Sequence, residues 1–591
     1  MNQPTPAIVP HQAAKAMPRV ALLLLCMAYV LPGFFGRAPW KSMDMAALGY
    51  MQALAQGRTN WLAPELLGMP VDANGLLPYW LGAWAIQWAP AWLPAEVAAR
   101  IPFIGFLALA LSMTWWATYH FARHPGAQPV AFAFGGEAQP ISYARAVADG
   151  ALLALIACLG LAQRGHETSV YLAQLCFTAT LLYAMAAKTT HPHKAALALL
   201  VGHTGLTLSG APALSLLFGL ASLGLQGGAR AQARIALRQQ VVTLGLFLFN
   251  IGLAGSLHLW RWQLALPGWG GNEWDSLLKL AIWFGWPAWP LALWTLWQWR
   301  HQLRDAHQYP HLFYPLWFTA VVITATILTP PADRTLLLGL PPLAMLAAFA
   351  LPTLKRSMAG WIEWFTLLFF SLSVLAIWTI WIAMHTGFPA KPAANIAKLA
   401  PSFVPQLELL PTAVALLGSL ACAALVWWRT TRHRTPLWKT LVLPASGAGL
   451  CWLLLTTLWL PLLDHARSYT VQIDRLKQAT DAQPGCLVSL GLGRAQVAAL
   501  LHHGPFTVHR RETGTTCPWL VTTPGYLQHP SSELNMSDWT LAARIERPTD
   551  KDDAMWLMRR NAPDAATANM GSTKLPAEHE PSDADRTTTR P

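Results

Sequence analysis

Apolar segments of about 20 residues recur along the chain, and short polar segments separate them. A helix of that length is long enough to cross the hydrocarbon core of a bilayer. The alternation therefore predicts a polytopic α-helical membrane protein with about thirteen transmembrane helices. The predicted spans are residues 20–35, 98–120, 146–163, 168–187, 194–208, 210–227, 239–259, 277–299, 313–330, 335–352, 362–385, 410–428 and 439–463.

The segment between the first two predicted spans, residues 37–97, has a different character. Its first part, residues 37–80, is too polar to cross a bilayer but carries more Trp, Tyr and Leu than an ordinary solvated loop. Asp44 opens a stretch in which apolar residues recur at i, i+3 spacing, namely Met45, Leu48, Met51 and Leu54. This spacing predicts an amphipathic helix lying in the membrane interface, with Asp44 near its positive N-terminal end. The alternative is a structural loop that Asp44 caps.

Composition agrees with a membrane protein, because 54% of the residues are hydrophobic and only 12% are charged, whereas about 25% are charged in a typical soluble protein. The net charge of +13 does not indicate a nucleic-acid partner, since basic residues gather in the cytoplasmic loops of membrane proteins. With residues 1–19 in the cytoplasm, every loop on that side carries at least two basic residues. The loops on the opposite side carry most of the acidic residues, alongside fewer basic ones. The pattern predicts a cytoplasmic N-terminus and, after an odd number of spans, a C-terminal region on the periplasmic side.

After the last span, residues 464–561 predict a small periplasmic α/β domain, and residues 562–591 have the composition of a disordered tail. The apolar run 486–493 predicts a strand and the next ten residues a helix. Further strands are predicted at residues 505–511, 517–523, 539–548 and 554–560. The polar C-terminal part contains Cys486 and Cys517, which would form a disulfide in an oxidising compartment. Two unrelated buried thiols are the alternative.

Candidate chemistry lies in the outward segments. Asp44 and Asp72 are carboxylates that can act as a general base on an acceptor hydroxyl, or bind a divalent metal cofactor through oxygen. Basic residues beside them can hold a phosphate or diphosphate, and the candidates are Arg37, Lys41, Arg58, Arg261 and Arg334. The candidate substrate contacts are Trp40, Tyr79 and Asp333. Interfacial anchoring is the alternative for Arg261 and Arg334, and a helix N-cap or a local ion pair is the alternative for Asp333.

Four segments of the chain occur in an order that resembles a known family. They are RAPWKSMD (37–44), GRTNWLAPELLGMPVDANGLLPYWLGA (57–83), GWPAWPLALWTLWQWR (285–300) and DRTLLLGLPPLAMLAA (333–348). The family is the C-type integral-membrane glycosyltransferases of the protein O-mannosyltransferase class, in particular bacterial enzymes related to the lipid A aminoarabinose transferase. The resemblance covers about residues 20–470.

This resemblance implies a transferase of the bacterial inner membrane that uses an undecaprenyl-phosphate-linked sugar. The acceptor would be lipid A, another envelope glycan or a protein, on the periplasmic face. Asp44 matches the acid of the family's first loop and Asp72 a second acid, and Arg261 and Arg334 would hold the lipid phosphate. The chain departs from the aminoarabinose enzymes at residues 74–77, where it reads Asn-Gly-Leu-Leu instead of Glu-Lys-Pro-Pro.

A transporter or flippase of lipid-linked sugars is the alternative function, because it would also need many spans and outward basic residues. Transporters are expected to carry ionisable residues near the bilayer midplane, whereas the predicted spans are almost free of them. An inactive scaffold derived from an enzyme is a third interpretation. The sequence favours a glycosyltransferase whose partners are the bilayer, a polyprenyl-phosphate sugar and an envelope glycolipid or protein.

Overall fold

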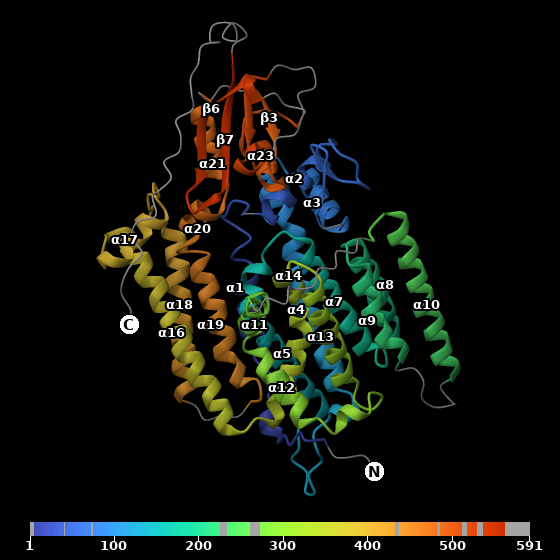
Figure 1. Ribbon diagram of the computed structural model, residues 1–591. Helices are drawn as coiled ribbons and strands as arrows, with labels where there is room; N and C mark the ends of the chain where they lie inside the picture. The colour runs from blue at the N-terminus through green and yellow to red at the C-terminus, as the bar shows by residue number, and fades with distance from the viewer. Residues whose placement is uncertain are drawn as a thin grey trace, which may run out of the picture.

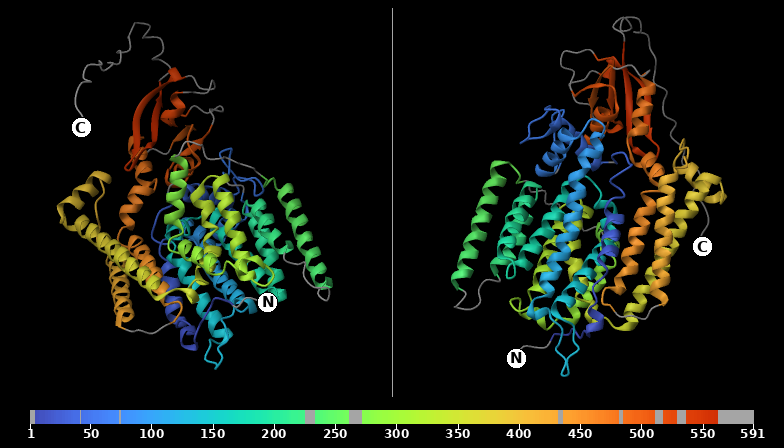
Figure 2. Two further views of the ribbon diagram at one scale, coloured as in Figure 1. Left: turned by 60° about the horizontal axis from the view of Figure 1, so that its bottom comes forward. Right: turned by 180° about the vertical axis from the view of Figure 1, so that it is seen from behind.

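The computed structural model describes residues 5–40, 42–72, 75–224, 233–260, 272–431, 436–480, 485–510, 517–528 and 536–561. It has a helical body and, at one end of that body, a small domain built on a β-sheet (Figure 1). The N-terminal end of the described chain lies at the opposite end of the body, as two further views also show (Figure 2). The predicted combination of a helical body with a C-terminal sheet region is therefore present.

Most helices of the body run along its long axis (Figure 1). Every predicted span overlaps one helix or a consecutive pair of helices. The helices of the body are α1 (Arg19–Val30), α4 (Ala95–Ala122), α5 (Pro140–Ala157), α6 (Leu159–Arg164), α7 (Val170–Ala187), α8 (Pro192–Leu208), α9 (Pro212–Gly224), α10 (Ala233–Ser256), α11 (Asn272–Phe284), α12 (Ala288–Gln298), α13 (Pro310–Leu328), α14 (Ala332–Leu337), α15 (Leu340–Ala348), α16 (Arg356–Thr386), α17 (Ala390–Leu399), α18 (Leu409–Thr431), α19 (Lys439–Leu455) and α20 (Leu460–Arg467).

Length and hydropathy separate these helices into two groups. Among the described residues, seven helical segments are long and apolar enough to cross a membrane, or eight if α19 and α20, bent by 68°, count as one span. Shorter apolar helices occur at Arg19–Val30, Pro212–Ser222 and Gln240–Ser256. The chain is thus built as a multi-pass membrane protein, and the total of thirteen spans stays a prediction.

The helices also differ in what surrounds them. Nearly all of α5 and α7 is buried, because small residues let neighbouring helices approach closely. A Cβ at Gly202 of α8, for example, would lie 2.6 Å from the side chain of Leu181 in α7. By contrast, α16 and α18 expose large apolar side chains such as Trp361 and Leu417. Exposed apolar faces of this extent are expected where a helix contacts lipid.

The first outer loop folds into α2 (Met43–Ala55), a short hairpin of β1 (Glu65–Leu66) and β2 (Met69–Pro70), and α3 (Leu77–Trp88). The predicted helix after Asp44 is therefore present, but its expected position with one face in the interface is wrong. Residues on all sides of α2 are buried, since the helix packs against α3, α4 and a helix of the C-terminal domain. Tertiary contacts on the polar side of the helix explain the difference.

The C-terminal domain contains α21 (Thr470–Ala479), β3 (Cys486–Leu490), α22 (Arg494–His503), β4 (Thr507–His509), β5 (Trp519–Thr522), α23 (Pro524–Gln528), β6 (Trp539–Arg547) and β7 (Asp550–Arg560). Its strands form one sheet in the order β4-β3-β5-β7-β6. The β3 strand is parallel to β4 and β5, whereas β7 is antiparallel to β5 and β6. The strands and the helix predicted from alternation occur at the expected places, and the tail at 562–591 lies outside the described residues.

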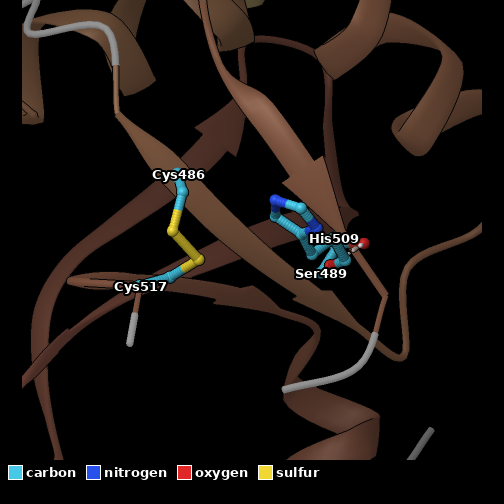
Figure 3. The surroundings of a disulfide bond; sticks show 4 residues. All are labelled: Cys486, Ser489, His509 and Cys517. Atoms are coloured by element: carbon cyan, nitrogen blue, oxygen red, sulfur yellow. Dashed lines mark hydrogen bonds between the residues drawn. A yellow bond between two sulfur atoms is a disulfide. The ribbon is translucent and has the colours of Figure 1, made fainter. Parts of the chain in front are cut away.

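Cys486 and Cys517 form a disulfide that joins β3 to the segment entering β5 (Figure 3). The bridge lies in a small apolar cluster that includes Val488 and Leu520. It therefore closes a connection between two neighbouring strands, which is the pairing suggested by the sequence. The remaining cysteines of the chain are unpaired.

Candidate active site

The carboxylate of Asp44 lies in the first turn of α2 and is 2% exposed. Its Oδ1 accepts hydrogen bonds from the backbone N–H (2.7 Å) and the hydroxyl (2.5 Å) of Thr168. Its Oδ2 is ion-paired with Arg37 and accepts a longer hydrogen bond from the backbone N–H of Trp40 (3.4 Å). Asp44 therefore connects the first outer loop to the loop between α6 and α7.

The guanidinium of Arg37 is also buried. It donates to the carbonyl of His166 (2.8 Å), and Arg100 of α4 donates to the carbonyl of Arg37 (2.8 Å). Burial alone would raise the pKa of Asp44, but the guanidiniums of Arg37 and Arg100 and the hydrogen bonds outweigh burial and lower that pKa to about 2. Asp44 is therefore ionised and a weak proton acceptor in this arrangement.

A second group of charges lies directly beside the first. Arg164, at the end of α6, pairs with Glu167 and with Asp333 of α14 (2.5 Å to Asp333). The Nε of Arg334 lies 3.5 Å from the carboxylate of Glu167. Burial raises the pKa of Glu167 although Arg164 and Arg334 act in the opposite direction. Because Glu167 immediately precedes Thr168, the two groups share one loop.

Trp40 and the end of α20 complete the network. The indole N–H of Trp40 donates to Asp464 (2.5 Å), and the guanidinium carbons of Arg37 and Arg467 lie 4.7 Å and 5.4 Å from the centre of its ring. Guanidiniums at these distances from an aromatic ring make cation–π contacts. Trp40 is only 7% exposed, so its position favours a packing role over the predicted contact with substrate.

A cavity of about 480 Å³ adjoins this network. Its polar side chains include Asp72, Tyr171, Gln174 and Thr335, the last of which follows Arg334 directly. Tyr171 likewise lies in the first turn of α7, four positions after Glu167, which places the ion network beside the cavity. The rest of the wall is mostly apolar and comes from α9, α13 and the segment that follows α10. It includes Leu214, Leu217, Leu259, Trp260, Trp317, Val321 and Leu328.

The C-terminal domain also reaches this cavity. Arg494, the first residue of α22, pairs with Asp72 and donates from Nε to the carbonyl of Pro70 (2.7 Å). The side chain of Asp72 is 54% exposed, so it is open to solvent on the cavity side despite this pair. A carboxylate at the wall of an apolar cavity and next to a cation is suited to orient a polar group.

The predicted site residues thus fall into separate places. Arg37 and Asp44 form one network, and Asp333 and Arg334 form the adjoining one. The alternatives for Asp333 were a helix N-cap or a local ion pair; Asp333 instead pairs with Arg164, and Pro331 is the N-cap of α14.

Other predicted residues lie elsewhere. Arg58 lines a different cavity, between the first loop and α22. Tyr79 is 7% exposed and packs against the ring of Tyr50 (5.6 Å between ring centres), which again favours a packing role. Lys41 and Arg261 lie outside the described residues.

The predicted metal ligands do not suit a metal ion as they are arranged here. Both oxygens of Asp44 already accept hydrogen bonds or an ion pair, and Asp72 is neutralised by Arg494. Within the described part of the chain, no group of three or more His, Cys, Asp or Glu side chains is placed to hold a metal. Metal binding by oxygen ligands would require these carboxylates to give up their arginines.

Several residues of the site were not among the sequence candidates, namely Arg100, Arg164, Glu167, Thr168, Asp464 and Arg467. Three of these six residues could have been found through one signal. The segment RGHETS (164–169) is a dense polar run in a loop only a few residues long between two predicted spans. Arg100 was hidden inside a predicted span, where its neighbours are apolar.

Comparison with solved structures relates this arrangement to known proteins. The chain is similar to ArnT from Cupriavidus metallidurans bound to undecaprenyl phosphate, with a TM-score of 0.56 and 13% identity over 92% of this chain and 98% of the other. It is similar to the apo state of the same protein, with a TM-score of 0.56 and 14% identity over 91% and 96% of the two chains. The chain shares the ArnT fold.

The resemblance to lipid A aminoarabinose transferases that the sequence predicts is thereby confirmed at the level of the fold. No protein-family model matches the sequence, and no curated protein matches it significantly. At 13–14% identity the similarity shows a shared fold. The chemistry depends on the residues of the site and does not follow from the fold.

Proposed function

We propose that this chain is a membrane glycosyltransferase that moves a sugar from a polyprenyl-phosphate-linked donor to an acceptor on the periplasmic face. The observation that carries the proposal is the apolar cavity of about 480 Å³ next to a network of partly buried arginines and carboxylates. A ligand that matches both surfaces has an apolar chain and an anionic head. Polyprenyl phosphate has this composition, and one ArnT structure of the same fold is bound to undecaprenyl phosphate.

The prenyl chain would occupy the apolar wall formed by α9 and α13. This wall includes Trp317 and Leu328, which both lie on α13. Apolar contacts of this kind contribute roughly 25 cal/mol per Å² of area removed from water and do not depend on the precise chain conformation. Such contacts select little among lipid chains, so the polar end of the site has to recognise the donor.

The phosphate would bind beside Arg334 and Arg164. Glu167 and Asp333 hold these two guanidiniums in place while leaving donors free for a phosphate oxygen. Negative charge grows on the phosphate as the sugar departs, so cations fixed beforehand stabilise the transition state more than the ground state. Arg261, outside the described residues, would add to this group by its place in the chain.

The acceptor would meet the sugar near Asp72. This carboxylate is half exposed and belongs to the cavity wall, whereas Asp44 is buried and held in its ionised form. In this proposal Asp72 accepts or orients the proton of the acceptor hydroxyl, and Asp44 positions Arg37 and the loop that carries Glu167.

Location in the bacterial inner membrane, with thirteen spans, a cytoplasmic N-terminus and a periplasmic C-terminal domain, belongs to the same proposal. It is supported by the bias of basic loops and by the placement of the N-terminal end and the sheet at opposite ends of the body. The Cys486–Cys517 disulfide also suits an oxidising compartment. The acceptor is an envelope glycan, lipid A included, or a protein.

Binding of undecaprenyl phosphate to the purified chain tests the donor site. Arg334→Ala should weaken binding about tenfold or more, because a charge-assisted contact to phosphate is lost. The matched control is Arg300→Ala, since Arg300 is exposed and its guanidinium stacks on Trp297. Equal affinity of the two variants would exclude the proposed phosphate site.

Mass spectrometry of envelope lipids and glycans tests the transfer itself. A sugar increment that disappears both in cells lacking this chain and in cells carrying Arg334→Ala or Asp72→Asn supports transfer. An increment lost only without the chain would favour a transporter of lipid-linked sugars or a scaffold. In that case the assigned carboxylates and arginines would have no catalytic role.

A further inference from the structure

A second cavity, of about 630 Å³, lies between the first outer loop and the C-terminal domain. Among the described residues, none lines both this cleft and the donor cavity. Its wall combines the end of α2, the segment up to β1, the tip of the β1–β2 hairpin and the end of α22. The polar residues of the wall are Gln52, Gln56, Arg58, Thr59, Asn60, Glu65 and His502.

Three polar side chains of this cleft are uncommitted. Within the described part of the chain, Arg58, Glu65 and Gln56 make no side-chain hydrogen bond or ion pair, and all three are exposed to the cleft. By contrast, outward charges around the donor cavity are paired, as Asp72 is with Arg494. Opposite charges that face one cleft without pairing are available to a ligand that can both donate and accept hydrogen bonds.

We propose that this cleft binds a carbohydrate portion of the acceptor, and this inference rests on the transferase function proposed above. Sugar hydroxyls both donate and accept, so they match a guanidinium, a carboxylate and planar amides placed side by side. The formal charges of Arg58 and Glu65 cancel, which disfavours a highly charged ligand. The hairpin strands are two residues long, which is too short an edge to bind a peptide by strand addition.

The hairpin connects this cleft to the donor cavity. Gly68 lines the cleft and Asp72 lines the donor cavity, and the two residues lie four positions apart in the chain. A fully extended segment of that length spans at most about 14 Å. A glycan of two or three sugar units held in the cleft could therefore place one hydroxyl near Asp72.

The cleft exists only while α22 is docked on α2. The helices meet where a Cβ on Gly49 would lie 2.6 Å from the methyl group of Ala498. Beside that contact, Gln52 hydrogen-bonds to His502 (2.9 Å), whose other nitrogen lies 3.6 Å from Glu96 of α4. The C-terminal domain thus completes an acceptor site that the membrane body alone would lack.

The test is equilibrium binding of the deacylated and dephosphorylated disaccharide of lipid A to the full chain in nanodiscs, with a Ser/Thr-rich peptide as the second probe. Arg58→Ala and the isosteric Glu65→Gln should each weaken glycan binding about tenfold. Both variants should bind undecaprenyl phosphate as the unaltered chain does. Arg544→Ala is the matched control, because Arg544 is exposed on β6 and stacks on Trp556 away from the cleft.

Each outcome decides the question. Glycan binding lost in both cleft variants but kept in the control supports the proposal. No glycan binding by the unaltered chain, binding that the cleft variants leave unchanged, or binding of the peptide alone overturns it. Failure of the chain to bind undecaprenyl phosphate would instead count against the transferase function, so the two failures are distinguishable. Size-exclusion chromatography of Glu65→Gln shows whether the fold is kept.

Discussion

The buried pair of Arg37 and Asp44 allows a quantitative prediction. Asp44→Asn keeps the size of the side chain but removes its charge, and it leaves Arg37 buried without a counter-ion. The amide can still accept a hydrogen bond from Thr168, so the loss should come mainly from the unpaired guanidinium. We expect the first loop and the loop at Thr168 to separate more often, without global unfolding.

The magnitude follows from the electrostatics of the site. Lowering the pKa of Asp44 from 3.8 to about 2 corresponds to about 2.4 kcal/mol in favour of the charged form. Removing one partner of a buried pair costs about 3–5 kcal/mol in measured cases. A local loss of about 2–4 kcal/mol is therefore expected, or about 30-fold to 700-fold in the opening equilibrium. Because the pKa is lowered, this stability is fully present above about pH 4 and is lost as the pH falls through about 2.

Hydrogen exchange at pH 7 measures this opening directly. The backbone amides of Thr168 and Trp40 both donate to Asp44, so they should exchange faster by that factor in Asp44→Asn. Asp275→Asn is the matched control, since its pair with Lys279 is more than half exposed and should contribute little.

The refuting result is clear. If Asp44→Asn changes the exchange of these amides by less than about twofold, the pair does not hold the two loops together. The positioning role proposed for Asp44 would then be wrong. Loss of transfer in that variant with unchanged exchange would point back to the direct role in proton transfer that the sequence predicted.

Three further predictions concern the C-terminal domain. Replacing Cys486 and Cys517 by Ser should destabilise the domain by about 3–4 kcal/mol, because the bridge closes a loop with a sequence separation of 31. Thermal unfolding with and without reductant measures this loss of stability. Burial and the neighbouring His502 lower the pKa of His503 to about 4, so below about pH 6.5 the folded form binds fewer protons than the unfolded form. The stability of the domain should therefore decrease as the pH is lowered from about 6.5 to about 4. A melting temperature that stays constant over that range would contradict this. Gly49→Leu should detach α22 from α2, because even a Cβ would lie 2.6 Å from a methyl group of α22. Protease cleavage between the two parts should rise relative to Gly525→Leu, a control at an open position of the same domain.

The sequence by itself determined the helical membrane body and the C-terminal sheet region. Hydrophobic periodicity acts over one element at a time, so the apolar segments, the strands of the C-terminal sheet and the helix after Asp44 could all be predicted from neighbouring residues. The family resemblance could also be recognised from the sequence, because the motifs at 37–44 and 333–348 occur in the family's order along the chain. The disulfide could be suggested from the sequence because Cys486 and Cys517 both lie in the polar C-terminal part, where an oxidising compartment would allow them to pair.

Only the tertiary structure decided how charges are combined. Arg37, Arg100 and Thr168 come from three different segments, and no local sequence pattern indicates that they surround Asp44. Packing of α22 on α2 buried a helix that its periodicity placed at the interface, because the partner lies about 450 residues further along the chain. The same packing placed Arg58 in a cleft of its own and paired Asp72 with Arg494. Electrostatic roles depend on distances of a few ångströms between such segments, and those distances exist only once the chain has folded.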